Sequence, residues 1–506
     1  MNSAGFPLLS LIVFLPLAGA LLVLVWDKRA HASIRAVSLG VTLAVLALTL
    51  AAVVLFRPAE AGMQWEEHLP WIPTLGISYR LGVDGFSLFL LPLTALLFVI
   101  AVLASWKPVG SDEASRSAVQ GYFFWLLLLE TGVLGVFLAL DLVLFYVFWE
   151  AMLIPMYFLI GRWGGERRAY ATVKFFIYTM AGSALMLVAI LALGYFAYQS
   201  TGAWTFDWQT LRGLNLPWPA PLWLFAMFGL AFAVKVPVFP FHTWLPDAYG
   251  EAPTPVTVLL AGVLSKMGIY GFVRFGLQLF PEGLRTAAPW LAVLAIIGIL
   301  YASLSALMQK DVKRMVAYSS VAHLSLVVLG VVVANAQSLA GVVMQMVSHG
   351  IYVAALFLIV GMLEERRGTR LIAEFGGLWK PAPLLGVCFL IAMLGAVGLP
   401  GLNGFVGEFL LLVGLFQSVR AYAVLGALGM ILGAWYMLWT FQRIMQGPAE
   451  GRNADVPDMR GVDLLVMVPL LVLIIILGVF PNLILGPAGA TIDALVGQAA
   501  AVAWLP

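Results

Sequence analysis

Six ionisable residues lie inside long apolar stretches, where they could bind and pass on protons. A charged side chain at the centre of a bilayer costs about 2.5–3.5 kcal/mol on insertion scales, so it is a functional candidate that faces a hydrated interior or a partner. Histidine adds a group that titrates near neutral pH. The six residues are Glu150, Lys235, Lys266, His323, His349 and Glu408.

A lysine and a glutamate together suit proton movement. When such a buried pair separates, the affinity of each group for a proton changes. The hydroxyls of Ser265 and Ser348 stand beside two of the candidates and could extend a proton path. Structural roles are the alternative: a lone membrane histidine often only bonds a neighbouring helix, and Glu150 could be a fixed counter-ion. Glu130 and Asp141 are expected nearer a helix end or loop and are weaker candidates.

The composition is typical of an integral membrane protein. The 506 residues are 62% apolar and only 10% charged, and the mean hydropathy is +1.01. A soluble chain carries about 45–50% apolar and about 25% charged residues. The net charge of +2 excludes an electrostatic nucleic-acid binder. The single cysteine, Cys388, excludes disulfides, iron–sulfur clusters and cysteine-ligated zinc within this chain.

Apolar runs between polar breaks predict an all-α polytopic membrane protein with about fourteen transmembrane helices. The first run is read as a retained helix, because no basic segment or cleavage site precedes its end. The longest polar stretches, 57–83, 201–219, 363–381 and 446–461, are loop-sized. The predicted spans are 5–25, 34–56, 84–105, 119–138, 140–161, 170–199, 220–240, 254–279, 288–308, 312–334, 337–362, 382–417, 420–445 and 462–485.

The distribution of positive charge supports this count. With both termini outside, nineteen of the 27 lysines and arginines fall in loops on the cytoplasmic side and six in the opposite loops. Cytoplasmic loops are enriched in lysine and arginine. A miscounted helix would exchange the two sides for every later loop and remove the bias. The bias continues to the C-terminus, which supports the count. We therefore expect 363–381 and 446–461 inside the cell, and 57–83 and 201–219 outside.

Two predicted spans carry helix breakers at membrane depth. The seventh contains Pro237 and Pro240, and the twelfth contains Pro400 among glycines. Such breaks survive only inside protein or beside water. Their spacing of five helices predicts two inverted five-helix repeats with broken helices 7 and 12. The expected units are an N-terminal three-helix segment, two repeats, and a C-terminal helix with a tail, at 1–110, 111–280, 281–446 and 447–506.

Four segments resemble the antiporter-like membrane subunits of bacterial proton-pumping NADH–quinone oxidoreductase (complex I). The block FWEAMLIPMYFLIG, the chain length and a glutamate at 408 favour the subunit M, or chain 4, family among them. The resemblance extends over roughly 80–485. The four segments are 148–161 (FWEAMLIPMYFLIG), 241–248 (FHTWLPDA), 251–255 (EAPTP) and 308–319 (MQKDVKRMVAYS).

The resemblance implies a role for each candidate. Glu150 matches the fifth-helix glutamate that pairs with the seventh-helix lysine, Lys235. Lys266 matches the connecting lysine of the eighth helix. His323 and His349 match the polar residues that lead onward.

Glu408 matches the terminal acid of the twelfth helix, and the sequence departs from its relatives at two positions. Many relatives have a histidine directly after Pro-Asp-Ala, where this chain has Tyr249. A histidine's proton-uptake role therefore does not carry over. At Ser265 relatives usually have leucine, so a hydroxyl is added beside Lys266.

The resemblance also implies a proton-translocating subunit with no cofactor of its own. It places the chain in the bacterial cytoplasmic (inner) membrane, beside other complex I membrane subunits, especially the antiporter-like chains L and N. NADH, FMN, iron–sulfur clusters and quinone are expected in partner subunits. This chain shows no glycine-rich nucleotide motif after a strand.

Several other classes stay open. A Mrp-type cation/proton antiporter subunit would use the same residues, and so would a subunit of a membrane-bound hydrogenase-type complex. An inorganic-carbon-uptake subunit is a further relative. A haem-binding electron carrier would need paired axial histidines, and only His242, His323 and His349 lie in or near spans. An inert scaffold is disfavoured by the six mid-membrane ionisable residues.

Overall fold

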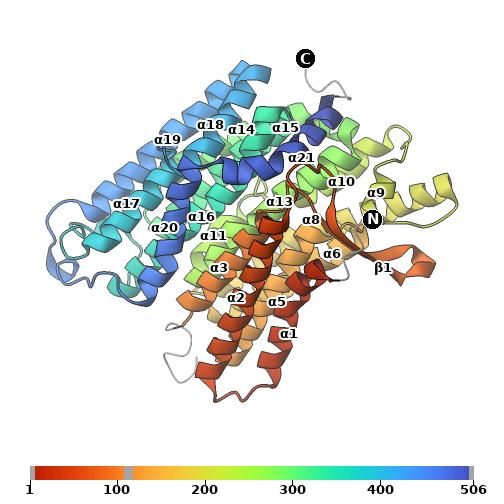
Figure 1. Cartoon of the computed structure of the whole chain (residues 1–506). Coiled ribbons are helices and arrows are strands. Elements are labelled where there is room, and N and C mark those ends of the chain that lie inside the picture. The colour runs from red at the N-terminus through yellow and green to blue at the C-terminus, as the bar shows by residue number, and fades with distance from the viewer. Residues whose placement is uncertain (1–5, 107–117, 501–506) are drawn as a thin grey trace.

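The computed structural model describes residues 6–106 and 118–500, most of them in helices (Figure 1). Twelve helices in these ranges are long and apolar enough to cross a membrane. They are α1 (Leu8–Val25), α2 (His31–Leu55), α5 (Val119–Leu138), the α6–α7 pair (Leu142–Trp163), α8 (Arg168–Thr201), the segment from α12 to η3 (Thr254–Leu277), α14 (Pro281–Leu307), α15 (Val312–Val333), α16 (Ala336–Arg367), α19 (Arg420–Met445), α20 (Val462–Val479) and α21 (Asn482–Ala500).

Shorter apolar helices occupy the remaining predicted spans. Every one of the fourteen predicted spans contains a helix, and two helices share the overlong stretch 382–417. The helix α21 follows in a segment where the sequence indicated no further span. The membrane-helix fold is confirmed, and the count of fourteen spans stays a prediction. The shorter helices are α3 (Leu90–Ala104), α10 (Ala220–Lys235), α17 (Pro383–Val397) and α18 (Asn403–Ser418).

A β-hairpin interrupts the otherwise helical order. Its strands, β1 (Gln64–Ile72) and β2 (Ile77–Val83), pair antiparallel around the turn η1 (Pro73–Leu75). The sequence predicts a loop over the polar stretch 57–83, but the structure has two strands there. Pro70 and two register irregularities interrupt the alternation that would have indicated them. Small elements between the long helices complete the chain: α9 (Trp208–Leu211), α11 (Trp244–Glu251), η4 (Ile372–Glu374) and η5 (Gly451–Asn453).

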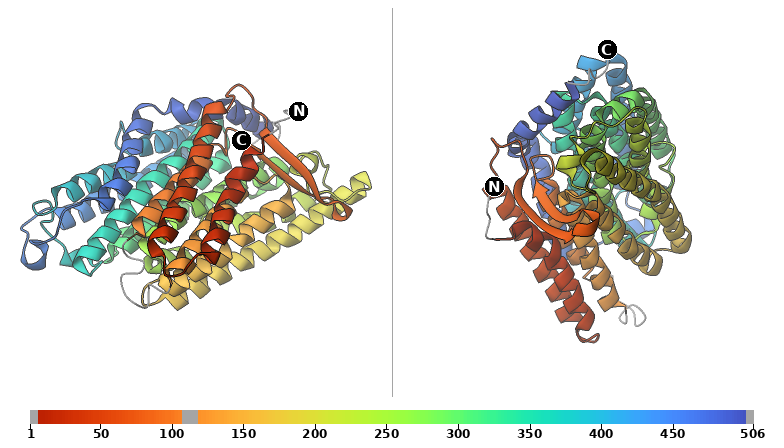
Figure 2. Two further views of the ribbon diagram at one scale, coloured as in Figure 1. Left: turned by 60° about the horizontal axis from the view of Figure 1, so that its bottom comes forward. Right: turned by 90° about the vertical axis from the view of Figure 1, so that its right-hand side faces the viewer.

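The loops gather at two opposite ends of the bundle. Figures 1 and 2 show the hairpin and α9 at one end, and the connection between α19 and α20 at the other. Arg80 bonds Asp207 at 2.6 Å, which joins 57–83 to 201–219. The amide of Gly377 donates to the Gln446 carbonyl at 2.9 Å, which joins 363–381 to 446–461.

The distribution of lysine and arginine predicts the same pairing: 57–83 with 201–219 on one side of the membrane, and 363–381 with 446–461 on the other. Which end faces the cytoplasm stays a prediction. Lys107 and Arg116 contribute to that bias and lie outside the described residues, as does the predicted boundary between 110 and 111.

Both predicted breaks are present. The helix α10 ends at Lys235, and α11 begins only at Trp244. The helix α17 ends at Val397, and α18 begins at Asn403. The arrangement of the helices as two inverted repeats stays a prediction.

Two further irregularities were not expected from the sequence. The fifth predicted span is divided at Met152 into α6 (Leu142–Ala151) and α7 (Leu153–Trp163). The eighth contains two π-helical stretches. It runs through α12 (Thr254–Leu259), η2 (Leu260–Leu264), α13 (Ser265–Gly271) and η3 (Phe272–Leu277).

Three helices form the centre of the bundle. The buried share of the most apolar window is 100% for Thr254–Leu277, 94% for α16 and 89% for α15, against 28% for α2. These central helices carry Lys266, His349 and His323. The ionisable groups therefore face protein and not lipid, as the cost of charge in hydrocarbon requires.

Candidate proton-transfer site

Lys266 lies where the eighth span changes from a π-helical to an α-helical turn. Its Nζ donates to the Ala261 carbonyl at 2.5 Å and lies 3.4 Å from the Ser265 hydroxyl. A π turn frees carbonyls from the regular α-helical pattern, and such turns are frequent at functional sites. The third neighbour of Nζ is His349 Nδ1, at 2.6 Å. The ammonium of a fully buried lysine therefore has polar contacts on several sides.

Two glycines allow this contact between helices. A Cβ on Gly350 would lie 2.8 Å from the Gly262 carbonyl oxygen, and one on Gly262 would lie 3.4 Å from the Gly350 oxygen. The backbones of α16 and η2 thus approach more closely than larger residues permit. Gly350 follows His349 directly, so this approach brings the imidazole to Lys266.

The polar chain continues from His349 to His323 and Glu408. The two imidazole rings are 5.8 Å apart, and Tyr352 lies 5.3 Å from the His349 ring and 5.7 Å from the His323 ring. His323 Nε2 lies 3.4 Å from Glu408 Oε1. Four of the six predicted residues therefore lie next to one another in space inside the bundle, in the order Lys266, His349, His323 and Glu408.

Glu408 is held at the break in the twelfth predicted span. Gln345 Nε2 donates to Glu408 Oε1 at 3.2 Å and also lies 3.0 Å from the Tyr352 hydroxyl. Gly398 has φ +77°, and a Cβ there would lie 2.7 Å from Glu408 Oε2. The broken backbone therefore leaves room for the carboxylate.

The rings along this chain keep hydrogen-bonding capacity. Among the described residues, His349 Nε2, His323 Nδ1 and Gln345 Oε1 are buried and have no protein partner. Buried polar atoms of this kind normally bond to protein or water. Each histidine thus has one nitrogen in a protein contact and a second available for transfer.

Lys235 and Glu150 form a separate group. Lys235 ends α10, where the partial negative charge of a helix C-terminus favours a cation. Its Nζ lies 3.5 Å from Met152 Sδ, and 5.2 Å and 5.8 Å from the ring centroids of Trp149 and Phe175. Glu150 lies next to the break between α6 and α7 and interacts electrostatically with Lys235. No carboxylate oxygen in the described ranges comes within 4.0 Å of that ammonium, so the pair is open.

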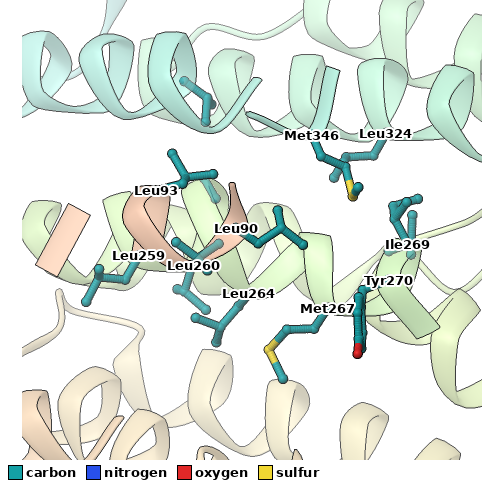
Figure 3. Close-up of a cluster of buried hydrophobic side chains, with 14 of the residues drawn as sticks. Leu90, Leu93, Leu259, Leu260, Leu264, Met267, Ile269, Tyr270, Leu324 and Met346 are labelled. Carbon is teal, nitrogen blue, oxygen red and sulfur yellow. The ribbon is translucent and has the colours of Figure 1, made fainter. Parts of the chain in front are cut away.

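The two groups are adjacent, but no hydrogen bond joins them within the described residues. The helix α10 packs on α13, and Val236 contacts the Gly268 position. Lys235 and Lys266 therefore lie on neighbouring helices, each within two residues of the contact between Val236 and Gly268. Apolar side chains of the eighth span pack against those of α3, α15 and α16 (Figure 3), and this packing keeps bulk water from the span. Those labelled in the figure are Leu90, Leu93, Leu259, Leu260, Leu264, Met267, Ile269, Tyr270, Leu324 and Met346.

Comparison with known proteins identifies the family of this chain. A sequence model of the NADH:quinone oxidoreductase/Mrp antiporter transmembrane family matches residues 139–433. NADH-quinone oxidoreductase subunit M of Rhodobacter capsulatus is 41% identical, over 97% of this chain and 96% of its own. The chain belongs to the subunit M family. The resemblance noted in the sequence is thereby confirmed.

Solved structures show the same fold as this subunit M-family chain. A chain of respiratory complex I from Thermus thermophilus with bound NADH is 32% identical, with a TM-score of 0.87, and the match covers 97% of this chain and 99% of that one. A chain of the Mrp complex from Dietzia matches with a TM-score of 0.82 over 98% of this chain and 100% of that one. Its identity is only 24%, so it shows the fold alone.

Sequence reasoning missed several polar residues of the site. Gln345 and Tyr352 lie on the same helix as His349, close to one turn before and after it, and this spacing was an available signal. Asn403 begins α18 within the predicted break, and both of its side-chain amide atoms are buried without a partner in the described ranges.

Glu130 and Asp141, the weaker candidates, have different environments. Glu130 lies inside α5 and not near its end. It is fully buried, and neither carboxylate oxygen has a partner among the described residues. Asp141 instead caps α6, since its side chain accepts from the amides of Val143 and Leu144 at 2.9 and 3.2 Å. Burial raises the pKa of Asp141. Hydrogen bonds from Ser78 and from these amides lower it, but the effect of burial is larger.

No group of three or more His, Cys, Asp or Glu side chains within 6–106 and 118–500 is arranged to hold a metal ion. The ionisable residues of the site pair with one another and with neutral polar groups. The arrangement is therefore suited to moving protons between nitrogen and oxygen atoms.

Proposed function

We propose that this chain is a proton-translocating, antiporter-like membrane subunit of a respiratory NADH–quinone oxidoreductase. The main support for the proposal is the series of polar side chains inside the bundle, which runs from Lys266 through His349 and His323 to Glu408. Membership of the subunit M family supports it. Redox chemistry in partner subunits, which would hold NADH, FMN, iron–sulfur clusters and quinone, supplies the driving force.

The contact between Lys266 and His349 holds one transferable proton. At 2.6 Å one nitrogen must offer a lone pair to a proton on the other. When the proton moves from the ammonium to Nδ1, His349 becomes the cation and can release its second proton from Nε2. The His323 ring is the next acceptor, and Glu408 beyond it receives the proton as a carboxylate. After this transfer the remaining His349 proton lies on Nδ1, and the ring must exchange it to Nε2 before Lys266 can pass the next proton.

Lys235 and Glu150 are proposed as the element that partner subunits drive. When the pair is closed, the carboxylate stabilises the protonated lysine. When it is open, as here, the ammonium is left with a thioether and two ring faces, which compensate poorly for lost hydration. Opening therefore lowers the affinity of Lys235 for its proton and favours transfer towards Lys266.

The proposed setting is the inner membrane, with both termini on the outer side and with antiporter-like chains L and N among the neighbours. A Mrp-type antiporter is the competing function, because the same fold occurs in a Mrp complex. Transport by a Mrp-type subunit would depend on sodium or another cation. Proton pumping in sodium-free medium distinguishes the two.

Replacement of Lys266 tests the proposal. In the purified complex in proteoliposomes, Lys266→Ala should abolish most coupled proton pumping with the complex assembled, because the first donor is lost. Lys310→Ala is the control, since Lys310 is exposed in the loop between α14 and α15, outside the polar chain. The measurement is protons translocated per NADH oxidised. An unchanged ratio in Lys266→Ala, or pumping that requires sodium, contradicts the proposal.

A further inference from the structure

A tyrosine hydroxyl lies beside the irregular turn that precedes Lys266. Tyr249, near the end of α11, is fully buried, and its hydroxyl donates to the Leu260 carbonyl at 3.0 Å. The same hydroxyl interacts with the Ser265 side chain. Leu260 begins the π-helical stretch η2. The irregular turn beside Lys266 therefore also positions this phenol.

Ser265 connects the phenol to the lysine. Its hydroxyl donates to the Ala261 carbonyl at 3.1 Å and lies 3.4 Å from Lys266 Nζ. Tyr249, Ser265 and Lys266 are thus consecutive polar groups with at most 2% of each residue exposed. A hydroxyl both donates and accepts, so two in series can relay a proton.

Beyond Tyr249 the surroundings become charged. Arg370 donates to the Gly250 carbonyl at 2.6 Å, and Lys313 donates to the Ala252 carbonyl at 2.8 Å. Both come from the end of the bundle that carries 363–381, the predicted cytoplasmic loop. Tyr249 therefore stands between these polar groups and the membrane interior.

We propose that Tyr249 and Ser265 form a hydroxyl relay that brings protons to Lys266 from the end of the molecule carrying Arg370 and Lys313. The inference rests on the proposed function and adds an uptake arm to it. A proton arrives at the Tyr249 oxygen while the phenol gives its own proton to Ser265. Ser265 then passes its proton to the neutral amine of Lys266. Each hydroxyl ends with one proton, and the lysine has gained one.

The competing explanation is purely structural. The Tyr249 ring packs edge-on against Trp244 and Phe357, at 6.3 and 5.7 Å between centroids. In that case the hydroxyl only satisfies the Leu260 carbonyl. Tyr249→Phe keeps the ring contacts and removes the hydroxyl, so it separates the two explanations.

The test uses the assembled complex in proteoliposomes and measures coupled NADH oxidation and protons pumped per NADH. Tyr249→Phe and Ser265→Ala should each lower coupled turnover about tenfold, the effect of raising a barrier by about 1.4 kcal/mol. Coupled turnover of the double variant should be no lower than that of either single variant, because both substitutions interrupt the same relay. Tyr249→His should restore turnover, because an imidazole also donates and accepts.

Tyr122→Phe is the matched control. Tyr122 is also fully buried and its hydroxyl lies 2.9 Å from that of Ser105, but it is outside the polar chain. This variant should pump as the unmodified complex does. Wild-type pumping in Ser265→Ala or in an assembled Tyr249→Phe complex overturns the relay, whereas a loss in Lys266→Ala alone leaves the proposed function intact. If Tyr249→Phe fails to assemble, Ser265→Ala decides. Pumping retained in Lys266→Ala contradicts the proposed function itself.

Discussion

Lys235 and Lys266 share a residue type but have opposite environments. Lys266 bonds a carbonyl and an imidazole, with a hydroxyl nearby, so its proton has a direct acceptor. Lys235 has a thioether and two aromatic faces around its ammonium. A buried charge without good partners is costly. We therefore propose different tasks for the two lysines: Lys235 responds to the position of Glu150, and Lys266 distributes protons.

Lys235→Arg tests whether Lys235 releases its proton. A guanidinium stays protonated in proteins, so we expect this variant to assemble but to pump nearly as poorly as Lys235→Ala. Glu150→Asp should keep part of the activity, since the shorter carboxylate retains the charge and loosens the contact. The measurement is the coupled proton-to-NADH ratio in proteoliposomes. An Arg variant that pumps at the normal ratio would make Lys235 a fixed counter-ion.

At the scale of elements, the sequence predicted the breaks that proline and glycine produce, and little else of the irregular backbone. The breaks after Lys235 and before Asn403 follow from local chemistry. The π-helical stretch η2 and the interruption at Met152 depend on tertiary contacts, such as the hydroxyl of Tyr249 on the Leu260 carbonyl. No local pattern encodes these contacts.

The site was predicted to a similar extent. The six ionisable residues were found because charge is rare in apolar runs. The resemblance implied their order from Lys266 to Glu408, but not the separation of Glu150 from Lys235, because that separation depends on how the surrounding helices pack. The neutral members, Gln345 and Tyr352, lack charge and did not stand out, although their spacing from His349 placed them near it.

Gly350→Val tests the close approach of α16 and η2. Its added side chain would press on the Gly262 carbonyl and on Leu93, whose Cδ2 lies 2.8 Å from the position of a Cβ. Overpacking of this kind costs roughly 1–3 kcal/mol. The helix must move, so the Lys266–His349 contact lengthens. We expect a lower unfolding temperature of the complex and a loss of coupled pumping.

Gly40→Ala in α2 is the control for this change, because nothing lies within 4 Å of a Cβ there. Alanine is the better helix former, so stability and pumping should not fall. Normal pumping by an assembled Gly350→Val complex would show that the Lys266–His349 distance does not limit transfer.

At the scale of the whole molecule, the polar chain runs within a bundle whose two ends differ. One end holds the hairpin, α9 and the middle of α21, where Thr491 accepts from the Gly85 amide at 3.1 Å. The other holds 363–381 and 446–461, which are joined by Arg366, whose Nε donates to the Pro457 carbonyl at 2.8 Å. Most of the positive charge lies at this second end. A proton path needs such a distinction, because uptake and release must occur on opposite sides of the membrane.

Cysteine labelling from each face of the membrane tests the orientation. The only native cysteine, Cys388, is buried, and Cys388→Ala supplies a background without a reactive thiol. Ala454→Cys and Ala203→Cys then place exposed thiols at the two ends. Because lysine and arginine are retained on the cytoplasmic side, an impermeant maleimide should label position 203 in intact cells and position 454 only in inverted vesicles. A permeant reagent should label both positions in either preparation. Labelling of 454 from outside would reverse the orientation, and with it the direction in which Tyr249 and Ser265 would bring protons to Lys266.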